Sequence, residues 1–197
     1  EDEFKRFLKF KLPNETHRIV KDTFIFMCLT GMAYSDMRAF SFSKLRTVGQ
    51  APFICYIRNK TKRYKKEVWV PLTSKAMDII NRYYMKPKHG SGRSQRSKSP
   101  EDAIFDTIQS MTNYNIKLKV LFEFNEMDLD FAISSHVARK TFGNLITKQL
   151  GLSAASQMLG HSSVSVTESS YVDNQSQQLL VQRFSQVSEL MDKEFGL

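Results

Sequence analysis

The sequence is short of cysteine and of long apolar runs, and these shortages narrow the classes of protein it can encode. Its 197 residues include two cysteines, Cys28 and Cys55, whose apolar neighbours are typical of buried structural thiols. No Cys/His cluster has zinc-finger spacing. No apolar run reaches the roughly 18 residues that a bilayer-spanning helix needs. We therefore expect a protein of the reducing cytoplasm without a membrane segment.

Clustered carboxylates are also scarce. Asp128 and Asp130 form a close pair, but they stand in an apolar stretch with no matching histidine. A metal-dependent nuclease needs several carboxylates around its ions. The sequence therefore predicts neither a bound metal nor another cofactor.

Positive charge, by contrast, is in excess. The formal net charge is +9 and the isoelectric point is about 9.5, a balance for which nucleic acid is the commonest partner. With 41% hydrophobic residues and 15 phenylalanines, the chain can also build a substantial core, which argues against disorder. A folded protein that binds nucleic acid fits both observations.

Hydrophobic periodicity predicts one domain that is mainly α, with a small antiparallel β-sheet near residues 42–72. Thr16 can cap the first long helix and Gly31 can end it, because glycine readily adopts the left-handed conformation of a helix end. A short helix is expected from Met37 onward. The other expected helices are 3–10, 16–29, 74–85, 106–122, 136–150, 153–159, 163–170 and 175–195, and the expected strands are 52–57 and 67–72.

Two stretches carry much of the positive charge. Residues 58–66 connect the two expected strands and predict a strongly basic β-hairpin. Residues 86–100 contain no apolar residue and predict a flexible basic surface loop. Both are candidates for contacts with phosphate groups, with a solvated charged surface as the alternative.

A histidine and an arginine share one face of the helix expected at 136–150. His136 and Arg139 are three residues apart, a spacing that brings side chains together on a helix. Arginine offers a planar fork to two phosphate oxygens and histidine can move a proton, so the pair suits a phosphodiester. An ordinary surface arginine near a helix start is the alternative.

A second motif, Leu159-Gly160-His161, separates two expected helices. Gly160 can end the first, which places His161 in a tight turn at a helix N-terminus, where backbone N–H groups favour an anion. A histidine that merely fills the turn is the alternative. Tyr171 follows ten residues after His161. The order His-x-x-Arg, Leu-Gly-His and Tyr in a basic chain favours phosphoryl transfer.

These motifs, in this order, resemble the catalytic domain of the tyrosine recombinase (phage integrase) family, and in particular mobile-element and conjugative-transposon integrases. The resemblance also covers the Thr30-Gly31 helix end and a lysine-bearing hairpin from Arg58 to Leu72, so it spans nearly the whole chain. It implies that family's fold for residues 1–197, without the N-terminal DNA-clamping domain that members usually have.

The resemblance implies a site-specific DNA recombinase. Tyr171 would attack the scissile phosphate in line and leave a 3′-phosphotyrosyl link and a free 5′-hydroxyl, and strands would rejoin without metal or ATP. The interval from His161 to Tyr171 is one residue longer than the family usually has, which a mobile segment can tolerate.

Four further residues receive roles from the same resemblance. Arg139 and His161 would hold the non-bridging oxygens, where charge builds in the transition state. His136 is the candidate base. Lys60 is the candidate acid that protonates the leaving oxygen, with Lys62 as the alternative.

The chain departs from the family pattern at Ala33. Members usually carry an arginine directly after the Thr-Gly-hydrophobic run, and alanine cannot contact a phosphate through its side chain. Arg38, and after it Arg18 or Lys21, are candidate replacement cations. A DNA-binding homologue with impaired catalysis is therefore the alternative function.

The implied partner is double-stranded DNA, bound by a homotetramer of the full-length protein in a bacterial, nucleoid-associated setting, with the isolated domain monomeric. The C-terminal helix, residues 174–195, would pack on its own domain or dock on a neighbouring protomer. The residues expected to contact DNA are Arg58, Lys62, Arg63, Lys65, Lys66 and Lys140.

Overall fold

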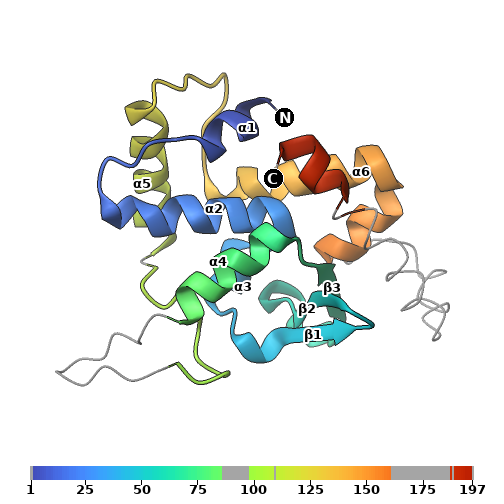
Figure 1. Ribbon diagram of the computed structural model, residues 1–197. Coiled ribbons are helices and arrows are strands. Elements are labelled where there is room, and N and C mark those ends of the chain that lie inside the picture. Colours follow the sequence, from blue (N-terminus) through green and yellow to red (C-terminus); the bar gives the residue numbers. More distant parts are fainter. Residues whose placement is uncertain (1, 86–97, 109, 161–186, 188, 197) are drawn as a thin grey trace.

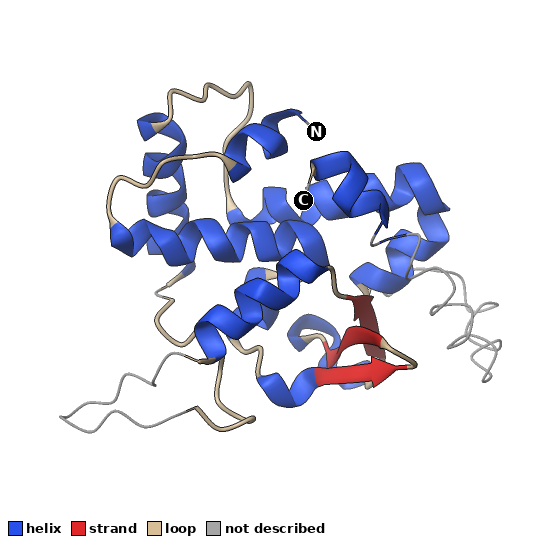
Figure 2. Cartoon of the chain, viewed as in Figure 1, coloured by secondary structure: helices blue, strands red, loops and turns tan. Residues whose placement is uncertain are grey.

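The computed structural model describes residues 2–85, 98–108, 110–160, 187 and 189–196 (Figure 1). It is mainly helical with one small antiparallel sheet (Figure 2), which confirms the predicted fold class. In chain order, with η marking a 3-10 helix, the elements are α1 (Asp2–Leu8), η1 (Glu15–His17), α2 (Arg18–Thr30), α3 (Tyr34–Arg38), η2 (Phe42–Lys44), β1 (Leu45–Val48), β2 (Ala51–Ile57), η3 (Asn59–Tyr64), β3 (Glu67–Pro71), α4 (Ser74–Tyr84), α5 (Met111–Phe124) and α6 (Ser135–Leu159).

Helix α2 lies at the centre of the fold because it is apolar on every side. From Val20 to Thr30 every residue except Lys21 is buried, as expected of a helix surrounded by other elements. Helices α4, α5 and α6 all contact it, and Figure 1 shows them arranged around it. Gly31 ends the helix in the left-handed conformation with φ 65°, which confirms the predicted helix end.

The three strands pair in the order β1-β2-β3, and one face of the sheet joins the main core. Ile54 pairs with Val70 and Tyr56 with Val68 across β2 and β3, and all four side chains are buried in that core. Side chains alternate between the two faces of a strand. Arg58, two residues beyond Tyr56, therefore continues the face that looks towards the helices.

Helix α6 is interrupted at Gly151, whose φ of 85° and ψ of 166° are not helical. The break separates the two helices predicted for this region. An unbroken helix would place Leu159 about 30 Å from Arg139, yet a hydrogen bond joins the two residues. The chain folds back at the break, and Figure 1 shows the orange end of α6 turning towards the sheet. Gly160 then ends the second half with φ 60°, as predicted.

Several helices begin at residues other than those predicted from the sequence. Asn14 caps η1 by accepting a hydrogen bond from the backbone N–H of Thr16, so Thr16 is not the cap of the long helix. Helix α3 already begins at Tyr34. Helix α5 begins at Met111, where the Ser110 side chain accepts from a first-turn N–H, and the residues before it form turns.

The prediction of a flexible basic surface loop at 86–100 is wrong for the C-terminal end of that range. Lys98 is buried, and its Nζ donates to the carbonyl oxygens of Tyr83 (3.1 Å) and Ile104 (2.5 Å) and to Asp106 Oδ1 (2.9 Å). Three acceptors match the three N–H groups of an ammonium. Lys98 therefore ties this end of the loop to the core and is not free to bind phosphate. Most of the loop lies outside the described residues.

The described end of the predicted C-terminal helix (174–195) is helical and packs on its own chain. Met191 and Phe195 are buried. The Phe195 ring lies 4.3 Å from the ring of Phe4 in α1, measured between centroids.

Both cysteines are buried and unpaired, as the sequence predicts. Burial raises the pKa of Cys28 well above its usual value and raises that of Cys55 to about 11, so both thiols stay protonated near neutral pH. Within the described ranges, none of the helices combines the length and the apolar character needed to cross a bilayer.

Gly31→Ala should destabilise the protein more than Gly49→Ala, although the two glycines have similar φ values of 65° and 63°. A Cβ at Gly31 would lie 2.5 Å from Phe142 Cδ1, whereas one at Gly49 would meet nothing within 4 Å. Gly49→Ala carries only the left-handed backbone penalty of about 1–2 kcal/mol, and Gly31→Ala adds about 1–3 kcal/mol of overpacking. Urea unfolding measures both free energies of unfolding, and equal losses would contradict the contact with Phe142.

Candidate functional site

Arg139 lies inside the protein, between the ends of two helices. It projects from the first half of α6 and is 6% exposed. Its Nη1 donates to the carbonyl oxygen of Gly31, and its Nη2 donates to that of Leu159 at 2.5 Å. The last carbonyls of a helix lack partners within the helix and carry partial negative charge. One guanidinium therefore caps the C-terminal ends of α2 and α6 together.

Arg58 reaches the same place from the end of β2. It is 7% exposed, and its Nη1 donates to the carbonyl oxygen of Gly160 at 2.9 Å. Because Gly160 follows Leu159, Arg58 and Arg139 bind consecutive carbonyl oxygens at the end of α6. A Cβ at position 160 would lie 2.7 Å from Arg58 Cδ and 2.4 Å from Val68 Cγ2. Glycine is therefore needed at position 160 for two reasons: the helix ends there, and the aliphatic part of the Arg58 side chain packs closely against it.

Asp36 in α3 supplies a carboxylate next to Arg58. Its Oδ2 lies 3.7 Å from Arg58 Nε, and its Oδ1 accepts a hydrogen bond from the backbone N–H of Asn59 at 2.9 Å. Asp36 is itself buried. It therefore holds both the side chain of Arg58 and the first residue of η3. We refer to Arg58, Arg139 and Asp36 as the arginine cluster.

The arginine cluster holds an excess of buried positive charge. Burial lowers the pKa of Arg139, and the positive charge of Arg58 lowers it further, while Tyr56 and Asp36 act in the opposite direction. Arginine stays protonated in proteins because its usual pKa exceeds 12. Two guanidinium groups thus face one carboxylate. Buried charge without full compensation is unfavourable, so the cluster suits an anion.

The other predicted catalytic residues are exposed or lie outside the described part of the chain. His136 is exposed in the first turn of α6, and Lys60 is exposed in η3. Arg38 is exposed at the end of α3. His161 and Tyr171 are not among the described residues.

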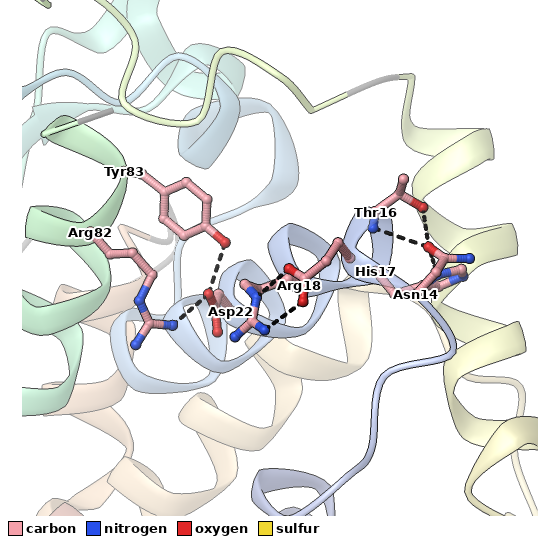
Figure 3. A network of polar contacts seen from close by, with 8 residues as sticks. Asn14, Thr16, His17, Arg18, Asp22, Arg82 and Tyr83 are labelled. Carbon is pink, nitrogen blue, oxygen red and sulfur yellow. Dashed lines mark hydrogen bonds and ion pairs between the residues drawn. The ribbon is translucent and has the colours of Figure 1, made fainter. Parts of the chain in front are cut away.

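Two of the predicted replacement cations lie near the beginning of α2. Arg18 pairs with Glu15 at 2.7 Å (Figure 3), and Lys21 Nζ donates to the carbonyl oxygen of Phe10 at 2.7 Å. Gly31, which binds Arg139, marks the other end of the helix. At 1.5 Å per residue, the backbone of Arg18 lies about 20 Å from Gly31. The structure therefore does not bring Arg18 into the arginine cluster, and Lys21 is also engaged elsewhere.

A second buried carboxylate, Asp22, offers a comparison. Its Oδ2 accepts hydrogen bonds from Arg82 Nη1 and from Tyr83 Oη, both at 2.8 Å (Figure 3). This network joins α2 to α4 and leaves Asp22 with one arginine and one hydroxyl. The arginine cluster differs because it sets two arginines against one carboxylate.

Among the residues predicted to contact DNA, Arg58 stands apart because it is buried. The signal for this placement was strand alternation: Ile54 and Tyr56 share one face of β2, and Arg58, directly after the strand, continues that face. Sequence reasoning also missed Asp36, whose pairing with Arg58 depends on a tertiary contact. The remaining predicted contacts are exposed, namely Lys62, Arg63, Lys65, Lys66 and Lys140.

Comparison with solved structures defines the fold. The chain is similar to the XerH site-specific recombinase bound to its difH substrate, with 11% identity and a TM-score of 0.58 over 92% of this chain and 51% of that one. It is also similar to the Tn1549 transposon integrase in complex with circular intermediate DNA, with 14% identity and a TM-score of 0.54 over 91% of this chain and 62% of that one. This is the fold of tyrosine recombinase catalytic domains, and the chain spans less than two thirds of each of those structures.

The phage integrase family model matches residues 1–178. The chain therefore belongs to the phage integrase family. No curated protein matches it in a sequence comparison.

Tyr56→Phe should remove part of the alkaline loss of stability. Burial, and then the charge of Asp36, raise the pKa of Tyr56 to about 12, while in the unfolded chain it is about 10. The folded state binds this proton more tightly, so its contribution is complete below pH 10 and is lost as the pH rises through 12. Between pH 9 and 11 the wild type should lose about 1 kcal/mol more free energy of unfolding than the variant. Urea unfolding at both pH values tests this, and parallel losses would refute it.

Proposed function

We propose that this chain is the catalytic domain of a site-specific DNA recombinase or integrase that cleaves and rejoins double-stranded DNA through Tyr171. The arginine cluster is the observation that supports this most. It places two buried guanidinium groups beside one carboxylate where two helices end. Membership of the phage integrase family agrees with it. The two similar structures are of proteins in complex with DNA.

In the proposed reaction, Tyr171 Oη loses its proton and attacks the scissile phosphorus in line. A bond forms between phosphorus and the tyrosine oxygen, and the bond from phosphorus to the 5′-oxygen breaks. The products are a 3′-phosphotyrosyl link and a 5′-hydroxyl that has gained a proton. Because the new link retains the energy of the phosphodiester, attack by a 5′-hydroxyl in the reverse direction can join strands without consuming a nucleotide.

Arg139 and His161 would hold the non-bridging oxygens, on which negative charge builds in the transition state. The hydrogen bonds from Arg139 to Gly31 and Leu159 fix its orientation before DNA arrives. A donor fixed in advance stabilises the transition state without the cost of reorganising at the moment of reaction. His136 would act as the base, and Lys60 or Lys62 as the acid; all three are exposed and therefore open to DNA.

The basic residues of η3 and its neighbours would position the duplex. Each phosphate that they neutralise should steepen the log–log dependence of binding on salt by about 0.9, and such contacts carry little sequence information. Exchange of strands between two DNA sites would require several protomers, which fits a tetramer of the full-length protein on DNA.

A catalytically impaired homologue that only binds DNA is the second candidate. Ala33 favours it, because the family's usual arginine is missing at this position. Loss of one fixed donor to a developing negative charge typically slows a reaction by about 10²–10³-fold. The two candidates differ in whether a covalent intermediate forms at all.

A nicked suicide duplex, incubated with the full-length protein in EDTA, should yield a covalent adduct that survives denaturation. The nick lets the fragment with the 5′-hydroxyl diffuse away, so the intermediate accumulates. Tyr171→Phe should give no adduct, and Arg139→Ala should form it about 10²–10³-fold more slowly. Tyr64→Phe, which alters an exposed tyrosine in η3, should react like the wild type and serves as the matched control.

Two results would count against the proposal. Adduct that persists in Tyr171→Phe would exclude this tyrosine as the nucleophile. DNA binding without any adduct, for the wild type under every condition, would favour the homologue that only binds DNA.

A further inference from the structure

Position 33 lies in the chain between two residues that contact the arginine cluster. Ala33 precedes α3 in an extended conformation and carries only a methyl group. On one side of it, Gly31 accepts a hydrogen bond from Arg139; on the other, Asp36 lies against Arg58. The segment from which a cation is missing therefore touches both arginines. Arg58, directly after β2, contacts this segment through Asp36.

Among the described residues, the buried Nε of Arg58 has no hydrogen-bond acceptor. Its Nη1 donates to Gly160, but its buried Nε forms no hydrogen bond with the described residues and lies 3.7 Å from Asp36 Oδ2, beyond hydrogen-bond distance. A buried donor without an acceptor is unfavourable. If Arg58 only capped α6, this would explain the hydrogen bond of its Nη1 and the packing of its aliphatic chain against Gly160. It would not explain why Nε is left without an acceptor among the described residues.

The net positive charge of the arginine cluster indicates what kind of group would accept a hydrogen bond from Arg58 Nε. Arg58 and Arg139 hold the two consecutive carbonyl oxygens of Leu159 and Gly160, so their positive charges lie close together. Burial lowers the pKa of Arg139, and the positive charge of Arg58 lowers it further. Among the described residues, the carboxylate paired with the cluster is that of Asp36, which balances one of the two charges. A phosphate oxygen with negative charge would relieve the repulsion and accept from both forks, because arginine geometry matches phosphate.

We propose that Arg58 supplies, from the end of β2, the guanidinium contact to the scissile phosphate that this chain lacks at position 33, and that Asp36 positions it. This rests on the strand-cleavage function proposed above. Arg58 acts directly on a non-bridging oxygen, together with Arg139. Asp36 touches no DNA and acts through Arg58, by restricting where the guanidinium points and by holding the backbone of Asn59 at the start of η3.

The test is the single-turnover rate of adduct formation on the suicide duplex, measured with the full-length protein. Arg58→Ala should slow it by about 10²–10³-fold. Arg58→Lys keeps the charge but loses the planar fork, and should still slow it by about 10-fold or more. Arg82→Lys, in the network around Asp22, is the matched control and should leave the rate unchanged. Wild-type rates for both Arg58 variants would overturn the proposal.

A change in the substrate separates contact with phosphate from a purely structural role. When a methyl group replaces one non-bridging oxygen of the scissile phosphate, the charge that Arg58 is proposed to bind is gone. On this altered substrate, adduct formation by Arg58→Lys should be less than about threefold slower than adduct formation by the wild type. Equal slowing on both substrates would mean that Arg58 only supports the fold. If the wild type does not cleave the altered duplex, a second variant decides. Adding Ala33→Arg to Arg58→Ala should raise the rate of adduct formation on the normal duplex at least about 10-fold. No increase in that rate would overturn the proposal.

A double-mutant cycle tests the positioning role of Asp36. Asp36→Asn should slow adduct formation by about 10-fold in the wild-type background and have no effect in Arg58→Ala, because coupled residues are not additive. Asp22→Asn is the control for removing a buried carboxylate. Equal slowing in both backgrounds would exclude action through Arg58. If the wild type forms no adduct, the proposed function itself fails; if it does and the Arg58 variants match it, only the role of Arg58 fails.

Discussion

The hydrogen bonds from Arg139 to the carbonyl oxygens of Gly31 and Leu159 are the contacts on which the site depends. They join the C-terminal ends of two helices whose carbonyls would otherwise lack partners. Both helices can end so abruptly because Gly31 and Gly160 adopt left-handed conformations. The break at Gly151 completes the arrangement by returning the end of α6 to the arginine. Sequence motifs that lie more than a hundred residues apart thereby form one site.

The same arrangement holds two positive charges close together, which is electrostatically unfavourable. Arg58 and Arg139 are brought together with one carboxylate between three chain segments, and burial keeps water from screening them. For folding alone, a pair of apolar side chains would serve as well or better. A protein that must stabilise charge on a phosphate gains from keeping these donors fixed in advance. The cluster is thus better explained by anion binding than by stability.

Local signals predicted much of this fold. The glycine ends of α2 and α6 and the buried face of β2 follow from backbone preference and strand alternation. Strand alternation indicates the face on which Arg58 lies, but its partners could not be predicted, because Asp36 and Gly160 are distant in the sequence. The position of Lys98 was predicted wrongly for the same reason. Its basic neighbours indicated a surface loop, but acceptors on α4 and after the loop hold its side chain inside the protein.

The central claim is that two arginines from different elements bind one phosphate. A crystal structure of full-length Tyr171→Phe on uncleaved target DNA would test it most directly. We predict that guanidinium nitrogens of Arg58 and Arg139 lie about 2.9 Å from non-bridging oxygens of the same scissile phosphate, with Asp36 still beside Arg58. A structure in which Arg58 contacts only Gly160 and Asp36, while the phosphate is held by Arg139 and some other cation, would contradict the account.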